Sequence, residues 1–359
     1  MSQHTLLSRY IQVIGFFMLL CAFFQSCGSA EKSVKRGDAA LALGEYAEAA
    51  GQYKKAYSQT SPKDKPARGR IAYKMGDAYR RYGNIARAAG AFQNAVRYHY
   101  TDTLTYLVLG HMLRQQGNYK SAEEAYRKYL EKDPNNEEAD RGIDYCLIAP
   151  VEKQKESAYT VKMAPLFNGS RSDYSPAYMG IEAQQLYFSS TRAQSKGDVS
   201  GITAMKNGDL YFSKKDERGK WKVVEPVEGD LNTEYDEGAC SFSQDGKTMY
   251  FTVCRSDPSY PRMAEIWTSQ RTEAKWAKPT QLKISGDTLS SYAHPALSPD
   301  GRWLYFTSDM PGGQGGLDLW RVELGGKHGM GRLENLGADI NTAGNECFPA
   351  FRPNGDLYF

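Results

Sequence analysis

A short apolar run recurs four times in the C-terminal half of the chain. Each copy is a Leu/Met-Tyr-Phe triplet, and three of the copies follow an Asp-Gly or Asn-Gly turn, at Asp245, Asp300 and Asn354. The phenylalanines of the copies are Phe188, Phe251, Phe306 and Phe359, which are 63, 55 and 53 residues apart. A period of about fifty residues, with short apolar strands and Gly-rich joints, is typical of a β-propeller or a related array.

Each of these units is predicted to hold an antiparallel sheet. A first strand ends before the turn, and the Leu-Tyr-Phe strand returns beside it. A third strand is expected around Leu210, Ile266 and Leu319. A fourth is indicated by Trp221–Val223 in the first unit and by Trp276 in the second.

Small and aromatic residues alternate at helical spacing in the N-terminal half, and the same pattern occurs three times. The three sets are Gly37, Gly44, Tyr46, Ala49, Tyr53 and Ala56; Gly76, Gly83, Ile85, Ala88, Phe92 and Ala95; and Gly110, Gly117, Tyr119, Ala122, Tyr126 and Tyr129. The offsets agree in all three sets, and the pattern resembles the tetratricopeptide repeat. The small residues let two antiparallel helices approach, and the aromatic residue fills the remaining gap. Glu137–Leu147 is predicted to cap the array, and residues 148–165 are predicted to be a linker.

The concave face of such an array is a predicted peptide-binding groove. The repeat offsets place seven polar or aromatic residues on this face: Arg70, Tyr73, Asp77, Arg80, Arg81, His111 and Arg114. They also place Leu104 and Leu107 there. Arginine forks favour an extended peptide with acidic groups or a free carboxylate. The alternative is that these residues form an ordinary solvated helix face.

The first 27 residues have the layout of a secretory signal. Arg9 precedes an apolar run from Ile11 to Phe24, and Ser26-Cys27 follows. The layout resembles a bacterial lipoprotein signal, which implies that Cys27 is lipidated after residues 1–26 are removed. The alternatives are a plain signal peptide that is cleaved near Ser29-Ala30, or an uncleaved membrane anchor.

The β units resemble the WD40-like repeats of TolB and of periplasmic propeller proteins, over residues 166–359. The residues that carry this resemblance are Ser298–Gly301, Gly312–Asp318 and the joints Leu231–Glu234 and Ile340–Glu346. The resemblance implies a β-propeller. Three units and the start of a fourth do not complete the usual ring of about four to eight blades, so we expect the 359 residues to be part of a longer chain.

Charge and composition exclude some functions. The chain has 45 basic and 42 acidic residues, and no long segment is basic enough to indicate a nucleic-acid partner. The five histidines are scattered, and the sequence contains no His-x-x-x-His, Cys-x-x-Cys or Gly-x-Ser-x-Gly motif. We therefore expect no catalytic site, metal or cofactor.

Two further sets of residues in the β half have open interpretations. The expected hairpin register argues against a Cys240–Cys254 disulfide and favours buried thiols. Asp236, Glu237, Asp309 and Asn345-Glu346 could bind a glycan at the mouth of a propeller. The favoured alternative is that they bond the loops and strand starts of neighbouring blades.

The order of these parts resembles the PorE-like periplasmic lipoproteins of the type IX secretion system. The resemblance implies a non-enzymatic scaffold on the periplasmic face of the outer membrane, in contact with envelope proteins of a secretion or gliding complex. Peptidoglycan would be bound only through an OmpA-like domain that this sequence does not contain. The alternative is a TolB-like envelope protein or sensor whose propeller binds a peptide or glycan. A propeller hydrolase is a third class.

Overall fold

A computed structural model of the chain describes residues 28–155, 160–257, 260–273, 275–326 and 329–359. It divides into a helical unit before Val161 and a β unit that comprises Val161–Ser200 and Met205–Phe359. Cys27 and the predicted signal peptide lie outside the described residues. Within the described ranges, no helix combines the length and the apolar character needed to cross a membrane.

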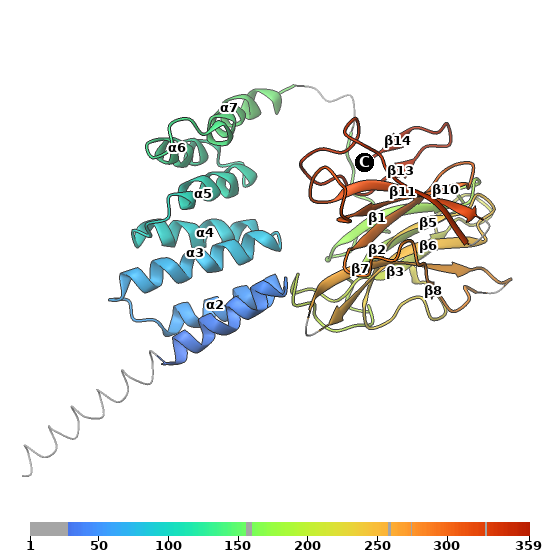
Figure 1. Cartoon of the computed structure of the whole chain (residues 1–359), viewed down its shortest axis with the longest axis horizontal. Coiled ribbons are helices and arrows are strands. Elements are labelled where there is room, and N and C mark those ends of the chain that lie inside the picture. The colour runs from blue at the N-terminus through green and yellow to red at the C-terminus, as the bar shows by residue number, and fades with distance from the viewer. Residues whose placement is uncertain (1–27, 156–159, 258–259, 274, 327–328) are drawn as a thin grey trace, which may run out of the picture. The chain divides into compact units, whose positions relative to one another are not determined.

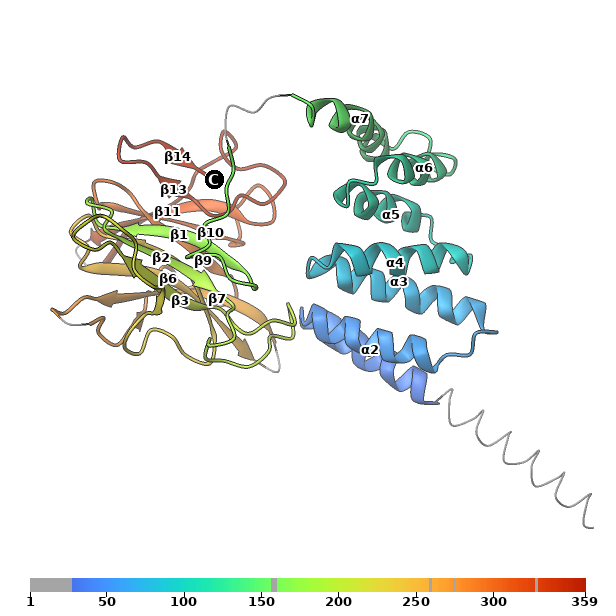
Figure 2. The same ribbon diagram turned by 180° about the vertical axis from the view of Figure 1, so that it is seen from behind.

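The helical unit is a stack of helices joined by short turns (Figure 1, Figure 2). Its helices are residues 28–42, α2 (Tyr46–Gln59), α3 (Lys65–Arg81), α4 (Ile85–Arg97), α5 (Leu104–Gln115), α6 (Tyr119–Leu130) and α7 (Glu137–Glu152). The first six form the three predicted helix pairs, and α7 packs on the third pair. The predicted tetratricopeptide-like array is therefore confirmed.

Side-chain caps and glycine turns set the ends of these helices. The capping side chains are Asp64, Asn84, Asn118 and Asn136, each of which accepts a hydrogen bond from a backbone N–H three residues later. Gly44, Gly83 and Gly117 take φ values of 76°, 80° and 76° in the turn inside each pair. That left-handed conformation favours glycine, which explains why the repeat places it there.

The contact inside each helix pair depends on a glycine and an aromatic ring. A Cβ atom on Gly37 would lie 2.6 Å from the Tyr53 ring, and one on Gly110 would lie 2.5 Å from the Tyr126 ring. Both rings are fully buried. Glycine is thus required for the close approach of the helices, as the repeat pattern predicts.

Helix α7 differs from its predicted extent. It ends at Glu152, five residues after the predicted end at Leu147, so the predicted linker begins with helix. Pro150 lies in the last turn, where its missing N–H removes one helical hydrogen bond, and the helix ends two residues later. Leu147, Ile148 and Val151, at this end of the helix, are exposed.

In the described part of the β unit there are three four-stranded antiparallel sheets and one hairpin, and neighbouring strands in each are consecutive in the chain. The first sheet is β1 (Asp173–Met179), β2 (Gln185–Ser190), β3 (Asp209–Lys214) and β4 (Glu225–Pro226). The second is β5 (Asp236–Phe242), β6 (Thr248–Asp257), β7 (Tyr260–Gln270) and β8 (Thr280–Gln281). The third is β9 (Tyr292–Leu297), β10 (Trp303–Ser308), β11 (Asp318–Gly326) and β12 (Gly329–Asn335), and the hairpin is β13 (Ala350–Phe351) with β14 (Leu357–Tyr358).

The predicted fourth strands are displaced. Trp221 and Trp276 form only isolated bridges, to Lys215 and Arg271, and β4 and β8 begin four residues after each tryptophan. Trp276 is instead buried against Tyr187 in the core. The three sheets and the hairpin form no closed barrel within the described part of the chain, so closure into a propeller stays a prediction.

The hairpin of β5 and β6 contains a bulge, which the expected register lacks. Phe242 lies opposite Met249 as predicted, but the register shifts between Gly238 and Ser241, and Asp236 lies opposite Cys254. Cys240 is buried and forms no disulfide with Cys254, as predicted, but Cys254 is only half-buried, so the prediction of buried thiols holds for Cys240 and not for Cys254.

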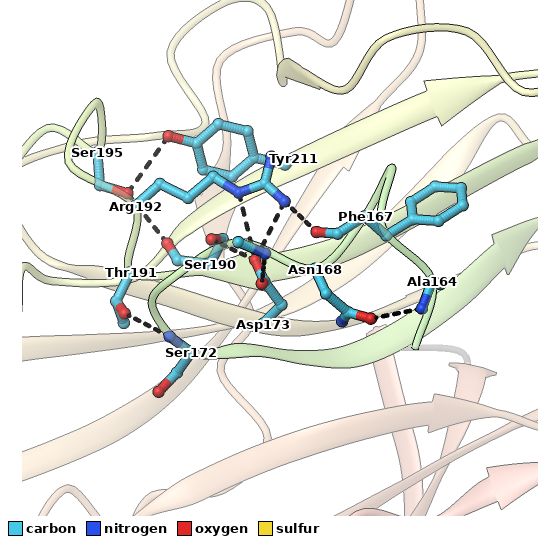
Figure 3. Close-up of polar contacts among 11 residues, drawn as sticks. Ala164, Phe167, Asn168, Ser172, Asp173, Ser190, Thr191, Arg192, Ser195 and Tyr211 are labelled. Carbon is cyan, nitrogen blue, oxygen red and sulfur yellow. Dashed lines mark hydrogen bonds and ion pairs between the residues drawn. The ribbon is translucent and has the colours of Figure 1, made fainter. Parts of the chain in front are cut away.

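An ion pair holds the start of β1 (Figure 3). Arg192 Nη2 lies 3.2 Å from Asp173 Oδ1, and the two side chains are only 18% and 6% exposed. Asp173 also accepts hydrogen bonds from Ser190 Oγ (2.6 Å) and Gly169 N (2.7 Å), and Arg192 donates to the Phe167 carbonyl. A buried ion pair is stable only where its remaining polar groups are satisfied, as they are here. These bonds fix the segment that leads into the first strand.

Candidate peptide-binding groove

The seven predicted groove residues lie on two helices. Arg70, Tyr73, Asp77, Arg80 and Arg81 are on α3, at spacings that place them on one face. His111 and Arg114 are on α5 and are one turn apart. Arg80 and Arg114 both act on the charge state of His111, which indicates that the two sets are within electrostatic reach of each other.

Asp77 orients two arginines. Arg80 Nη2 donates a 2.6 Å hydrogen bond to Asp77 Oδ1, and Arg81 Nε donates a 2.8 Å hydrogen bond to Oδ2. A guanidinium has five N–H donors, so most of the donors of both arginines are not used by Asp77. The two arginine side chains are 38% and 44% exposed, and pairs of this kind contribute only about 0–1 kcal/mol to folding. The trio therefore carries an excess positive charge, and Asp77 favours one orientation of the two arginines.

Tyr73 forms part of an aromatic wall. Its ring meets Phe92 edge-on at 5.7 Å and lies 5.0 Å from the ring of Tyr100. Burial, with the nearby Asp102 carboxylate, raises the pKa of Tyr73, so it is a neutral phenol at physiological pH. Tyr73 offers a ring surface and a hydroxyl, and no charge.

Arg70 borders a hollow of about 630 Å³ at the first turn of α3. The hollow is lined by Lys65, Pro66, Ala67, Arg70, Tyr98, His99, Tyr100 and Thr101. These lining residues, all within the described structure, include two permanent cations and no carboxylate. An anionic group is the chemical complement of this lining.

His111 is held by neighbours in the helical unit. Its Nδ1 lies 2.9 Å from Tyr126 Oη, and its Nε2 lies 3.2 Å from Glu138 Oε1. Burial, with the positive charges of Arg114 and Arg80, lowers the pKa of His111 below its ordinary value. His111 is thus neutral at physiological pH, and both of its ring nitrogens have partners.

Arg114 has a buried atom without a partner. Its Nε is enclosed and makes no hydrogen bond within the described structure. Its guanidinium lies 5.4 Å above the ring of Tyr145 on α7, a cation–π distance. Arg114 therefore places a positive charge near His111, where it helps to lower the His111 pKa.

Sequence reasoning missed one member of this face. Asp38 directly follows Gly37, as Asp77 follows Gly76 and His111 follows Gly110, so the repeat offset was the available signal. Lys74 Nζ and Tyr53 Oη each donate a 2.6 Å hydrogen bond to Asp38. Burial opposes ionisation of Asp38, but these two bonds outweigh it and lower its pKa. The residue after the first glycine of each repeat is therefore polar (Asp38, Asp77 or His111). It bonds to the buried aromatic residue of its repeat or to nearby cations.

The acidic residues of the β unit join loops to strands. Glu237 accepts hydrogen bonds from Thr233 N (3.0 Å) and Thr233 Oγ1 (2.5 Å), and Glu346 repeats the same two bonds with Thr342. Asp236 accepts from Gly208 N in the preceding sheet, and Asp309 accepts from Ser291 N. The bond to Asp236 joins neighbouring sheets, as the favoured alternative predicts, whereas the bonds to Glu237, Glu346 and Asp309 hold loops and strand starts within one repeat. Among the described residues, no group of three or more His, Cys, Asp or Glu side chains could hold a metal ion.

Comparison with known proteins supports the helical repeats. Residues 73–137, from α3 to the start of α7, match the tetratricopeptide repeat family. The N-terminal region is therefore made of tetratricopeptide repeats, which generally mediate protein–protein interactions. A search of curated protein sequences gives no significant match.

Solved tetratricopeptide domains resemble the helical part of the chain. The first such domain of Spaghetti (RPAP3), bound to the HSP90 peptide SRMEEVD, is 23% identical and has a TM-score of 0.30, over 34% of this chain and 94% of that one. The domain of OM64 from Arabidopsis is 17% identical with a TM-score of 0.30, over 34% and 96%. The domain of Sgt2 from Aspergillus fumigatus is 25% identical with a TM-score of 0.30, over 38% and 89%.

Proposed function

We propose that the chain is a non-enzymatic scaffold whose tetratricopeptide repeats bind an extended peptide that carries carboxylates. The observation that supports this most directly is that Asp77 bonds both Arg80 and Arg81, while most N–H donors of the two guanidinium groups are not used by Asp77. Orientation in advance reduces the entropy that these side chains lose on binding. Charge-assisted hydrogen bonds from arginine to a carboxylate are also among the stronger polar contacts.

The rest of the groove fits an acidic peptide as well. The hollow beside Arg70 offers cations and tyrosine rings to a terminal carboxylate or an acidic side chain. Arg114 extends the positive charge along the face, and neutral His111 adds none. The peptide backbone would cross the wall formed by Tyr73 and Tyr100.

In the same proposal, the scaffold is attached to the outer membrane by a lipid on Cys27 and faces the periplasm. Its partners are envelope proteins of a type IX secretion or gliding complex, and its sheets belong to a β-propeller. The Ser26-Cys27 boundary and the resemblance of the repeats to periplasmic propeller proteins support this placement. The alternative is a TolB-like envelope protein or sensor that binds its ligand on the β unit.

The test is titration of the full chain with a fluorescein-labelled decapeptide that ends in Asp-Glu with a free carboxylate. Arg80→Ala combined with Arg81→Ala should weaken binding roughly tenfold, which corresponds to about 1.4 kcal/mol. The loss should be larger at low salt, where charge attraction is least screened. Arg127→Ala is the matched control, because Arg127 is an exposed arginine on α6 that pairs with Glu123. Equal affinity of the wild type and the double variant, with the fold intact, would sink the proposal.

A further inference from the structure

The last strand of the third sheet differs from its counterparts in the other two sheets. Strands β4, β8 and β12 each lie at one end of a four-stranded sheet, and each has a neighbouring strand on one side within the described sheets. β4 and β8 have two residues each, whereas β12 has seven, from Gly329 to Asn335. An end strand of this length presents a row of backbone N–H and C=O groups that can pair with another strand.

Three equivalent hydrogen bonds align these end strands with one another. In each sheet, a backbone N–H at the end of the last strand donates to a backbone carbonyl of the third strand. The three donor and acceptor pairs are Val227 and Leu210, Leu282 and Ile266, and Leu336 and Leu319. Successive residues of an antiparallel strand point their backbone groups to alternate sides. The residues one and three positions before each donor therefore point their backbone groups away from the sheet.

Proline occupies one of these outward positions in each of the first two sheets. Pro226 lies one position before Val227, and Pro279 lies three positions before Leu282. Proline has no N–H to offer to a further strand, and it is a common protection of sheet edges. The corresponding residues of the third sheet are Asn335 and Leu333, which both have an N–H. The third sheet thus lacks the protection that the other two sheets have.

The side chains of β12 are complementary to a second copy of the same strand. When two β12 strands run antiparallel about a two-fold axis at Leu333, Arg332 of each copy lies opposite Glu334 of the other. Opposite charges across two strands are favourable, whereas an axis at Arg332 or Glu334 would bring like charges together. The backbone fits the same register, because the N–H and C=O of Leu333 point outward at the axis.

The charged side chains beside this axis are partly exposed and lie on one face of the strand. Arg332 is 62% exposed, and its Nε lies 2.7 Å from Glu334 Oε1. Arg321 Nη2 lies 2.7 Å from the other oxygen of Glu334. In a pair of strands, four side chains of alternating charge would surround the axis, and each Glu334 would keep its contact with Arg321. Exposed ion pairs contribute little to affinity, so these charges select the register while backbone hydrogen bonds supply most of the attraction.

We propose that two copies of this chain associate through β12, so that their third sheets form one continuous antiparallel sheet across a two-fold axis at Leu333. The order Arg-Leu-Glu of residues 332–334 favours a second copy over an unrelated strand, because it complements itself about its central residue. The proposal does not depend on the helical groove or on the lipid anchor.

Sedimentation velocity of the full chain in a non-ionic detergent, over roughly a hundredfold range of protein concentration, tests the association. The wild type should change from monomer to dimer as the concentration rises. Leu333→Pro removes the N–H at the axis and should weaken dimerisation at least roughly tenfold. Leu333→Ala is the matched control, because it shortens the same side chain and keeps the N–H. It should dimerise more tightly than the proline variant.

Charge reversal tests the register. Arg332→Glu and Glu334→Arg each place like charges opposite one another, so each variant alone should dimerise at least roughly tenfold more weakly than the wild type. An equimolar mixture of the two variants should dimerise more tightly than either alone, because opposite charges then face each other on both sides of the axis. Arg302→Glu is the control, since Arg302 is 63% exposed and pairs with Glu323 but lies outside β12.

Hydrogen exchange and circular dichroism separate this interface from other interfaces and from loss of folding. The amides of residues 331–335 should exchange more slowly as the protein concentration rises, and those of β4 should not. If circular dichroism shows that Leu333→Pro unfolds, the charge variants decide the test. A wild type that stays monomeric, a dimer that Arg332→Glu leaves unchanged, or slower exchange only outside residues 331–335 would each overturn the proposal.

Discussion

The hydroxyl of Thr252 accepts a 2.9 Å hydrogen bond from the backbone N–H of His294. The two residues belong to β6 and β9, on neighbouring sheets. Thr252 follows the Met-Tyr-Phe triplet, and Ser189, which follows the Leu-Tyr-Phe triplet of the first sheet, makes the equivalent bond to Ala239. In the first two sheets the residue after the triplet therefore accepts from a residue of the next sheet whose backbone is left-handed, with φ values of 42° at Ala239 and 52° at His294. In the third sheet, Thr307 instead donates to the Glu346 carbonyl.

Thr252→Val should lower the stability of the β unit. Valine keeps the shape of threonine but leaves the His294 N–H without its acceptor, at an expected cost of about 1–3 kcal/mol. Thermal unfolding followed by near-ultraviolet circular dichroism would measure the change. Thr248→Val on the same strand is the control, because the Thr248 hydroxyl bonds only the exposed side chain of Gln270. Equal effects of the two changes would show that the connection between sheets is energetically unimportant.

Gly76→Ala should destabilise the helical unit. A Cβ atom at this position would lie 2.8 Å from the Phe92 ring, so α3 and α4 would have to separate, at an expected cost of about 1–3 kcal/mol. Gly90→Ala on α4 is the matched change, because no atom lies within 4 Å of its Cβ position. That variant should gain about 0.5–1 kcal/mol from helix propensity. Chemical denaturation of both variants tests the pair, and two shifts of the same sign would contradict the packing described here.

The sequence predicts the buried pattern of this protein better than its polar partners. Periodicity indicates which positions face a core. That information was enough to predict the three helix pairs and the first three strands of each sheet. The partners of Asp77 and His111 depend on side-chain rotamers and on neighbouring helices, which no spacing rule encodes. The spacing places Asp77, Arg80 and Arg81 on one face, but it does not indicate that Asp77 bonds both arginines. The left-handed backbone at Ser175, Ala239, His294 and Phe348 had no signal in the sequence either, because these residue types do not favour that conformation.

Cys27→Ala should move the full chain from the membrane fraction to the soluble fraction of cells. The reason is that Cys27 is the proposed lipidated residue, and its acyl chains are the proposed attachment to the membrane. Mass spectrometry of the mature N-terminus would detect the added acyl mass in the wild type. Cys21→Ala is the control, since bulky Leu20 makes Cys21 a poorer lipidation site. An unmodified N-terminus in the wild type would refute the lipid anchor.

Glu237 should make the stability of the β unit depend on pH. Burial, opposed by the hydrogen bonds from Thr233 and aided by the charges of Asp209 and Asp236, raises the pKa of Glu237 to about 8. In the unfolded chain a glutamate has a pKa of about 4.3, so between these values the folded protein holds a proton that the unfolded chain lacks. The stability from this group is therefore fully present below about pH 4 and is lost as the pH rises through about 8.

Glu237→Gln tests this relation, because glutamine keeps the shape and stays neutral at every pH. The melting temperature of the wild type, measured relative to that of the variant, should fall steadily between about pH 5 and pH 8. Glu346→Gln changes the equivalent contact with Thr342 and serves as the control for loss of the carboxylate. Parallel pH profiles of the wild type and Glu237→Gln would mean that Glu237 is ionised in the folded protein. In that case the Thr233 hydrogen bonds would outweigh the burial of the carboxylate.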